Sequence, residues 1–179
     1  MEYKLKTIST SGIDGALSKA QLYRYLNEPE ESESICQDIL VADPENQAAK
    51  RLLGLAITDQ FCGIPSDRYA EAEATFKALS DPYKREYYLG ILSERRAKAQ
   101  ARAGRPSHVW VLLFEDAMKH FEAAENIKPS DNEEAVLRWN RCVRLLQAVP
   151  QTAREEPVSF EDNDTSPLEL ARPFGKSSR

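Results

Sequence analysis

The stretch from Ala117 to Pro129 constrains the fold of this chain more than any other. Ala117, Phe121 and Ala124 are spaced by four and three residues, so they lie on one face of a helix that ends before Pro129. Weaker copies of this spacing occur twice earlier in the chain, at Ser32 and Cys36 and at Ala72, Phe76 and Leu79. The chain is therefore expected to consist of repeated helical units.

This spacing resembles the second helix of the tetratricopeptide repeat, in which Ala is followed by Phe four, Ala seven and Pro twelve residues later. Leu53-Gly54 and Leu89-Gly90 stand at the Leu-Gly positions of the first helix of such a repeat, and Asp43-Pro44-Glu45-Asn46 resembles its ending. The resemblance covers residues 13–147. It implies an all-α fold of about seven helices, in which antiparallel helix pairs stack into a right-handed superhelix, a TPR-like α-solenoid.

The same resemblance divides the chain into segments. Repeats are expected at about 13–46, 47–82 and 83–130, followed by a capping helix at 132–147 that covers the apolar end of the stack. Residues 1–12 are predicted to be a flexible arm because they lack a helical period and end in a polar break. Residues 148–179 are predicted to be a disordered, acidic, proline-containing tail. Whether this tail is inert, carries a linear motif or docks on the domain remains open.

Composition narrows the cellular setting and the class of partner. The chain has 179 residues, a net charge of −5 and a pI near 5.2, which disfavour nonspecific attraction to nucleic acid or anionic lipid. No apolar stretch suggests a signal peptide or reaches the roughly 20 residues of a membrane span. Cys36, Cys62 and Cys142 are odd in number and widely separated, which argues against a disulfide framework. A cytoplasmic location is therefore expected.

A second resemblance, to the J-domain, is contradicted by the histidines of the chain. The stretch from Leu79 to Arg85 is similar to the end of a J-domain. That domain acts through a His-Pro-Asp tripeptide, which this chain does not contain, since its two histidines are His108 and His120. The shared string is better explained as a helix start, with Ser80 or Asp81 as the cap and Pro82 in the first turn.

Catalytic signatures are missing from the sequence. It contains no phosphate-binding loop, no dinucleotide fingerprint, no nucleophile elbow and no His-Glu-x-x-His zinc motif. Neither His108 nor His120 has Cys, Asp or Glu neighbours at metal-ligand spacing. We therefore expect a non-catalytic protein without a metal or cofactor.

The resemblance also implies a binding surface, because the first helix of each pair lines a groove in such a stack. The positions it selects are aromatic and moderately basic: Arg24, Tyr25, Arg51, Leu55, Tyr87, Tyr88, Arg95, Asn140 and Arg144. Arginine pairs with carboxylates in a bidentate geometry, and tyrosine offers contact area at low entropic cost. The expected function is a scaffold or adaptor that binds a partner peptide or protein segment, and an acidic segment is the leading candidate. The carboxylate clamp of chaperone-binding family members is not reproduced, because Leu17 and Gln21 occupy two of its places.

Two other functions stay open at this point. The helical stack could be a structural subunit of a stable multiprotein assembly or a homo-oligomer. Binding of nucleic acid is less favoured, although the segment from Lys84 to Arg105 carries seven cations against two carboxylates. The sequence does not identify the partner, the pathway or the oligomeric state.

Overall fold

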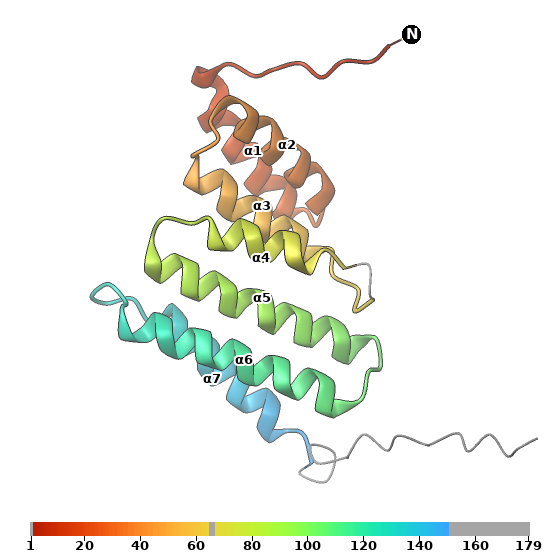
Figure 1. Ribbon diagram of the computed structural model, residues 1–179, viewed down its shortest axis with the longest axis vertical. Coiled ribbons are helices and arrows are strands. Elements are labelled where there is room, and N and C mark those ends of the chain that lie inside the picture. The colour runs from red at the N-terminus through yellow and green to blue at the C-terminus, as the bar shows by residue number, and fades with distance from the viewer. Residues whose placement is uncertain (1, 65–66, 151–179) are drawn as a thin grey trace, which may run out of the picture.

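The computed structural model describes residues 2–64 and 67–150, and these residues are all-helical (Figure 1). They contain one 3-10 helix and seven α-helices, and no β-strand. The 3-10 helix is η1 (Thr10–Gly12); the α-helices are α1 (Ile13–Tyr25), α2 (Pro29–Ala42), α3 (Gln47–Asp59), α4 (Tyr69–Lys77), α5 (Pro82–Arg102), α6 (Ser107–Asn126) and α7 (Glu134–Gln147). The all-α class and the number of helices agree with the expectation from sequence. The predicted tail lies almost entirely outside the described residues.

Short polar segments start several of these helices. Pro29 and Pro82 occupy the first helical positions of α2 and α5, where the missing N–H costs nothing. The side chain of Asn46 accepts a hydrogen bond from the Ala49 amide at 3.0 Å, and that of Asp81 accepts one from the Lys84 amide at 3.3 Å. These caps satisfy amides that have no partner within the helix. The connections are short, so consecutive helices pack side by side in opposite directions.

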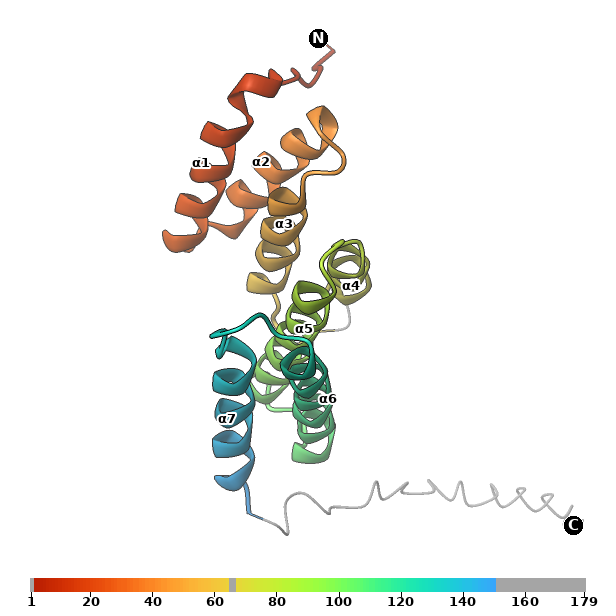
Figure 2. The ribbon, with the colours of Figure 1, turned by 90° about the vertical axis from the view of Figure 1, so that its left-hand side faces the viewer.

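The helices form an elongated molecule. In Figure 2, α4 and α6 lie on one side and α1 and α7 lie on the other, with α2, α3 and α5 between them. Each helix packs on its neighbours in the sequence, and α5 with α6 makes the most extensive of these contacts. At the amino-terminal end, Ile8 packs against the cluster of Ile13, Ile39 and Ala49. No helix among the described residues has the length and apolar character needed to cross a membrane.

The same kind of steric contact occurs in two helical pairs, between α3 and α4 (the second pair) and between α5 and α6 (the third pair). A Cβ atom placed on Gly54 of α3 would lie 2.4 Å from the ring of Phe76 on α4. A Cβ atom on Gly90 of α5 would lie 2.5 Å from the ring of Phe121 on α6. Both rings are completely buried. In each pair the glycine therefore lets the phenylalanine ring lie directly on the backbone of the partner helix.

The first pair uses smaller residues at the related positions. Ala20 of α1 and Cys36 of α2 are both fully buried and share a cluster with Leu52. Burial raises the pKa of the Cys36 thiol to about 11, so this side chain is a packing residue and not a reactive thiolate. In this pair, the larger alanine replaces the glycine of the other two pairs, and the smaller cysteine replaces their phenylalanine.

A buried ion pair joins the first helical pair to the second. Glu33 of α2 is only 8% exposed and contacts Arg68, which precedes α4, at 2.7 Å. It also accepts a hydrogen bond from Gln60, the residue after α3, at 2.8 Å. The hydrogen bonds from Arg68 lower the pKa of this carboxyl against the opposing effect of burial. Glu33 is therefore ionised in the fold and fixes α2 against the connection between α3 and α4.

Replacement of Gly90 by Ala tests the steric contact. The added methyl group collides with the Phe121 ring, and we expect a loss of about 1–3 kcal/mol from overpacking. Alanine gains roughly 1 kcal/mol over glycine inside a helix, so the expected net loss is about 0–2 kcal/mol. Gly15→Ala is the matched control, because nothing lies within 4 Å of its added Cβ, and it should stabilise the protein. Urea titration of the two variants gives both values, and a stabilising Gly90→Ala would contradict this account of the packing.

Candidate functional site

Three hollows on the side of α1, α3, α5 and α7 join into one groove, which we call the inner groove. The first, of about 660 Å³, and a middle hollow of about 200 Å³ share Tyr87, Tyr88 and Glu134 in their linings. The middle hollow shares Arg95 and Arg138 with a third one of about 260 Å³. Shared walls make these hollows a continuous depression that runs along α5.

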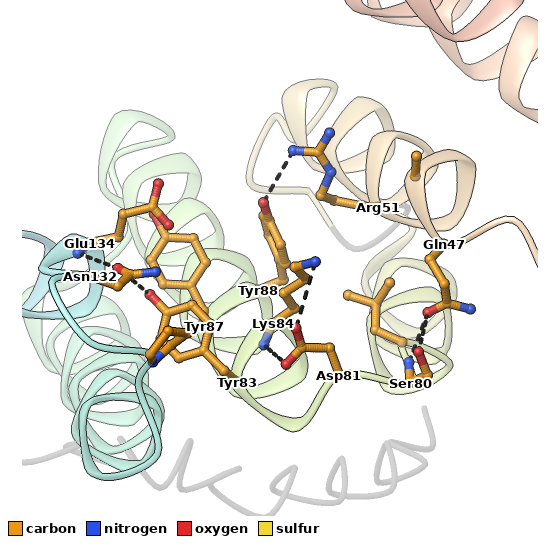
Figure 3. A pocket seen from close by; sticks show the side chains of 13 residues that line it. Gln47, Arg51, Ser80, Asp81, Tyr83, Lys84, Tyr87, Tyr88, Asn132 and Glu134 are labelled. Carbon is orange, nitrogen blue, oxygen red and sulfur yellow. Dashed lines mark hydrogen bonds and ion pairs between the residues drawn. The ribbon is translucent and has the colours of Figure 1, made fainter. Parts of the chain in front are cut away.

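The first hollow, which we call the tyrosine pocket, lies between α3 and the start of α7 (Figure 3). Tyr83, Tyr87 and Tyr88 of α5 line it. The Tyr83 and Tyr87 rings are stacked with centroids 5.9 Å apart, and the Tyr87 and Tyr88 rings meet edge to face at 5.1 Å. Rings held in this way give a ligand a firm apolar surface with little entropy left to lose.

Contacts with the core hold these tyrosine rings in place. Tyr88 stacks on Phe76 at 5.5 Å, and Tyr87 packs against Phe121 at 6.0 Å. The Tyr83 hydroxyl donates a hydrogen bond to Asn132 at 2.9 Å. Burial raises the pKa of Tyr83 to about 12, with a further contribution from the charge of Glu134. The pocket therefore depends on the phenylalanine rings that pack against Gly54 and Gly90.

Arg51 is the cation of the tyrosine pocket that remains available to a ligand. Among the described contacts, its guanidinium makes one long polar contact, a 3.5 Å approach to the Tyr88 hydroxyl, and no ion pair. Figure 3 shows it projecting from α3 beside the Tyr88 ring. Lys84 lies below it and has only a 3.6 Å approach to Asp81. A carboxylate that enters this pocket can pair with Arg51 without displacing a stronger internal partner.

The third hollow, which we call the basic pocket, is lined by Arg95, Lys98, Arg102 and Arg138 against two carboxylates, Asp59 and Glu94. Glu94 is 1% exposed and is contacted by Lys98 and, at 3.5 Å, by Arg138. Although burial lowers the pKa of Arg138, a hydrogen bond with Tyr87 and the charge of Glu94 outweigh this effect and raise it. Arg138 therefore stays charged, and four basic side chains against two carboxylates make the basic pocket positive.

Asp59 joins two arginines on neighbouring helices. It contacts Arg24 of α1 at 2.8 Å and Arg95 of α5 at 2.5 Å. Arg95 also donates hydrogen bonds to the Leu55 carbonyl at 3.0 Å and to the Thr58 hydroxyl at 2.6 Å. Burial lowers the pKa of Arg95, and Asp59 opposes that effect. Arg95 thus serves mainly to connect α3 and α5, and only its remaining exposed surface faces the groove.

Taken together, the lining of the inner groove is positive although the whole chain is negative. Seven cations and four carboxylates line the three hollows, a net charge of +3 against −5 for the chain. The cations of the segment from Lys84 to Arg105 do not share one face. Arg96, for example, lies 4.1 Å above the Tyr69 ring, outside the groove lining. The lining of the inner groove therefore holds only part of the positive charge of this segment.

Most of the residues predicted from sequence lie in this groove. Arg24, Arg51, Leu55, Tyr87, Tyr88 and Arg95 all line at least one of the three hollows. The other three predicted residues do not. Tyr25 is 74% exposed and its hydroxyl accepts a hydrogen bond from Gln21 at 2.7 Å. Asn140 and Arg144 are exposed and lie outside the lining of all three hollows.

Helical phase explains why Asn140 lies outside the groove lining. Asn140 is two positions from Arg138, a turn of about 200° at 100° per residue, so it faces away when Arg138 faces the groove. Sequence reasoning missed Glu134 and Arg138, which line the groove from α7, and Lys98 and Arg102 on α5. The spacing could have located Arg138, because it lies three positions after Ala135 and four before Cys142, the two buried residues of α7.

Metal binding has no support in the described residues. They contain no group of three or more His, Cys, Asp and Glu side chains arranged to hold a metal ion. Burial raises the pKa of Cys142 to about 12, so its thiol is protonated beside the basic pocket. His120 pairs with Glu86 at 2.8 Å between α6 and α5, which gives it a role in packing.

Comparisons of this chain with protein-family models, with curated proteins and with solved structures find no match. The case for a function therefore depends on the residues of the inner groove and on the repeated packing of the helices.

Replacement of Asp59 by Asn tests the link between α1, α3 and α5. The change leaves Arg24 and Arg95 without their shared carboxylate in a partly buried setting, and we expect a loss of about 1–3 kcal/mol. Glu45→Gln is the matched control, because Glu45 pairs with Lys50 but its side chain is 85% exposed. The control should change the free energy of unfolding by less than about 0.5 kcal/mol. Equal effects of the two changes in urea titrations would show that Asp59 has no structural role.

The raised pKa of Tyr83 predicts that the protein loses stability at alkaline pH. Its pKa is raised from 10 to about 12 in the fold. The contribution of Tyr83 to the free energy of unfolding is therefore intact below pH 10 and is lost as the pH rises from 10 through 12. Tyr83→Phe should lower stability at pH 8 by about 0.5–1.5 kcal/mol through the lost hydrogen bond to Asn132. It should also flatten the decline between pH 10 and 11. Tyr3→Phe, at a 90% exposed position, serves as the control and should leave the whole pH profile unchanged.

Proposed function

We propose that this protein is a non-catalytic scaffold or adaptor whose inner groove binds an extended, acidic segment of a partner protein. We also propose that its helical pairs form a superhelical stack of the tetratricopeptide type. Three pairs and a terminal helix suit this architecture, in which the first helices of the pairs line the binding face. The observation that carries the functional proposal is the groove itself, with a firm tyrosine floor, an available Arg51 and a net positive lining.

Repetition of the buried positions supports the stack. The three second helices bury the same three positions, at spacings of four and three residues. These positions are Ser32, Cys36 and Ile39 in α2, Ala72, Phe76 and Leu79 in and after α4, and Ala117, Phe121 and Ala124 in α6, and each is at most 2% exposed. A unit that buries equivalent positions in successive copies is typical of a repeat protein, in which each pair completes the core of its neighbour.

The shape and charge of the groove support a peptide ligand. It runs along α5 for much of that helix, and a narrow open channel of this kind suits an extended chain better than a compact small molecule. The basic pocket can pair with carboxylates, and the tyrosine pocket can hold an apolar or aromatic side chain beside Arg51. The expected ligand therefore has acidic residues near an apolar one.

Selection from a random dodecapeptide library displayed on phage, with the full chain as bait, tests this proposal. Selected sequences should be rich in Asp and Glu around one aromatic or large aliphatic residue. Arg51→Glu with Arg102→Glu reverses one charge in each pocket without touching the Asp59 network, and should weaken binding of the selected peptides at least about tenfold.

The matched control reverses two exposed charges on the other side of the molecule, with Lys77→Glu on α4 and Lys119→Glu on α6. It makes the same change in net charge, so binding should stay within about twofold of the original affinity. No enrichment in the selection, or an equal loss of binding in the groove variant and its control, would contradict a role for the inner groove.

A further inference from the structure

We propose that residues 155–162 of this same chain dock in the inner groove, with Glu155 and Glu156 in the basic pocket and Phe160 in the tyrosine pocket. The segment follows α7 in the sequence and lies beyond the described residues. In this position it competes with the partner segment. The inference concerns regulation of the groove and rests on the proposed function.

The path of α7 places the start of this segment next to the basic pocket. Tyr83, in the first turn of α5, bonds to Asn132 just before α7. Glu94, farther along α5, meets Arg138 in the second turn of α7. The two helices therefore run in the same direction, and the end of α7 at Gln147 lies toward the end of α5 that carries Lys98 and Arg102. A chain that leaves α7 and turns back meets the basic pocket first.

The length of chain is sufficient for this turn. Arg138 lies nine positions before Gln147, about 14 Å along the helix at 1.5 Å per residue. From Gln147 to Glu155 there are eight residues, which span up to about 26 Å when extended. Glu155 and Glu156 can therefore return to Arg138 and Lys98 with several residues left over for the turn.

The spacing of the charges and the aromatic ring then matches the groove. Tyr87 and Lys98 are eleven positions apart on α5, about 16 Å. Glu155 and Phe160 are five residues apart, about 17 Å in an extended strand. When the acidic pair occupies the basic pocket, Phe160 therefore reaches the tyrosine pocket.

Charge complementarity continues past the aromatic residue. Glu161 and Asp162 follow Phe160 directly, where Arg51 and Lys84 line the tyrosine pocket. From Glu155 to Asp164 the segment carries five carboxylates and no Lys or Arg. This is the composition that the positive lining of the groove selects, and it belongs to a segment already tethered beside the groove.

Tethering gives this segment an advantage over a free ligand. A short linker holds a segment at an effective concentration on the order of millimolar. If the free segment binds with a Kd of about 100 µM, the tethered copy therefore lowers the apparent affinity of a competing peptide about tenfold. A partner segment must then bind more tightly, or at a higher concentration, than an open groove would require.

The test measures binding of a fluorescein-labelled peptide of residues 153–165 to full-length chains. One chain carries Glu156→Lys and Phe160→Ser. Its matched control carries Glu169→Lys and Phe174→Ser, the same pair of changes farther along the tail. We expect the labelled peptide to bind the Glu156→Lys, Phe160→Ser chain about tenfold more tightly than the wild-type or control chain. Adding Arg51→Glu and Arg102→Glu to that chain should remove the binding.

A second measurement observes the docked segment within the wild-type chain. In amide NMR spectra, the signals of Arg51, Tyr88 and Lys98 should shift between wild type and the Glu156→Lys, Phe160→Ser chain, and should not shift in the control. Unchanged groove signals, or equal affinity of the labelled peptide for all three chains, would overturn the inference.

Two further outcomes separate this inference from the proposed function. If peptides selected from the phage library bind the Glu156→Lys, Phe160→Ser chain but the labelled peptide does not, self-docking is wrong and the groove remains a binding site. If neither binds, both proposals fail.

Sedimentation over a range of concentrations tests whether the segment docks instead on a second copy of the chain. A dimer that is lost in the Glu156→Lys, Phe160→Ser chain would place the segment in a neighbouring molecule and overturn docking within one chain.

Discussion

The contact between a helical glycine and a buried phenylalanine ring is the interaction on which this fold depends. At Gly54 against Phe76 and at Gly90 against Phe121, the ring occupies the space that a Cβ atom on the glycine would need. Glycine is unfavourable inside a helix, so the gain must come from the packing that the absent side chain permits. In the first pair, Ala20 and Cys36 satisfy the same limit on volume with a different division between the two helices.

The core packing and the candidate binding surface share one helix, α5. α5 buries Gly90 against Phe121, and one turn earlier it turns Tyr87 and Tyr88 toward the inner groove. The tyrosine rings rest on Phe76 and Phe121. Because a close-packed interior deforms little, the shape of the tyrosine pocket follows from the spacing of the helices behind it. Changes in the core are therefore expected to reach the groove.

Electrostatics divide the molecule in a way that its net charge conceals. The negative charge of the chain includes seven carboxylates between Glu28 and Glu45, in and beside α2, whereas the inner groove has a positive lining. Some charged side chains of that lining form ion pairs within the protein, as Asp59 does with Arg24 and Arg95. Arg51 has no ion pair among the described contacts. Groove walls of low dielectric strengthen its attraction for an acidic segment. The groove thus combines charges that hold the helices with charges that can meet a ligand.

The sequence by itself determined the helical class, the number of helices and the packing positions. The helical period, the prolines at helix starts and the recurring small and aromatic residues are local signals that survive in a single sequence. Six of the nine residues named from the sequence line the three hollows, and five of these six lie on α3 and α5, where Leu53-Gly54 and Leu89-Gly90 indicate the helical phase. Only the tertiary structure decided the phase of α7, where Arg138 and not Asn140 faces the groove. The tertiary structure also decided which arginines pair with Asp59 and which remain available to a ligand. The pairs of Asp59 with Arg24 and with Arg95 join residues from different helices. Their distances follow from how the helices stack, and no local pattern of residues encodes them.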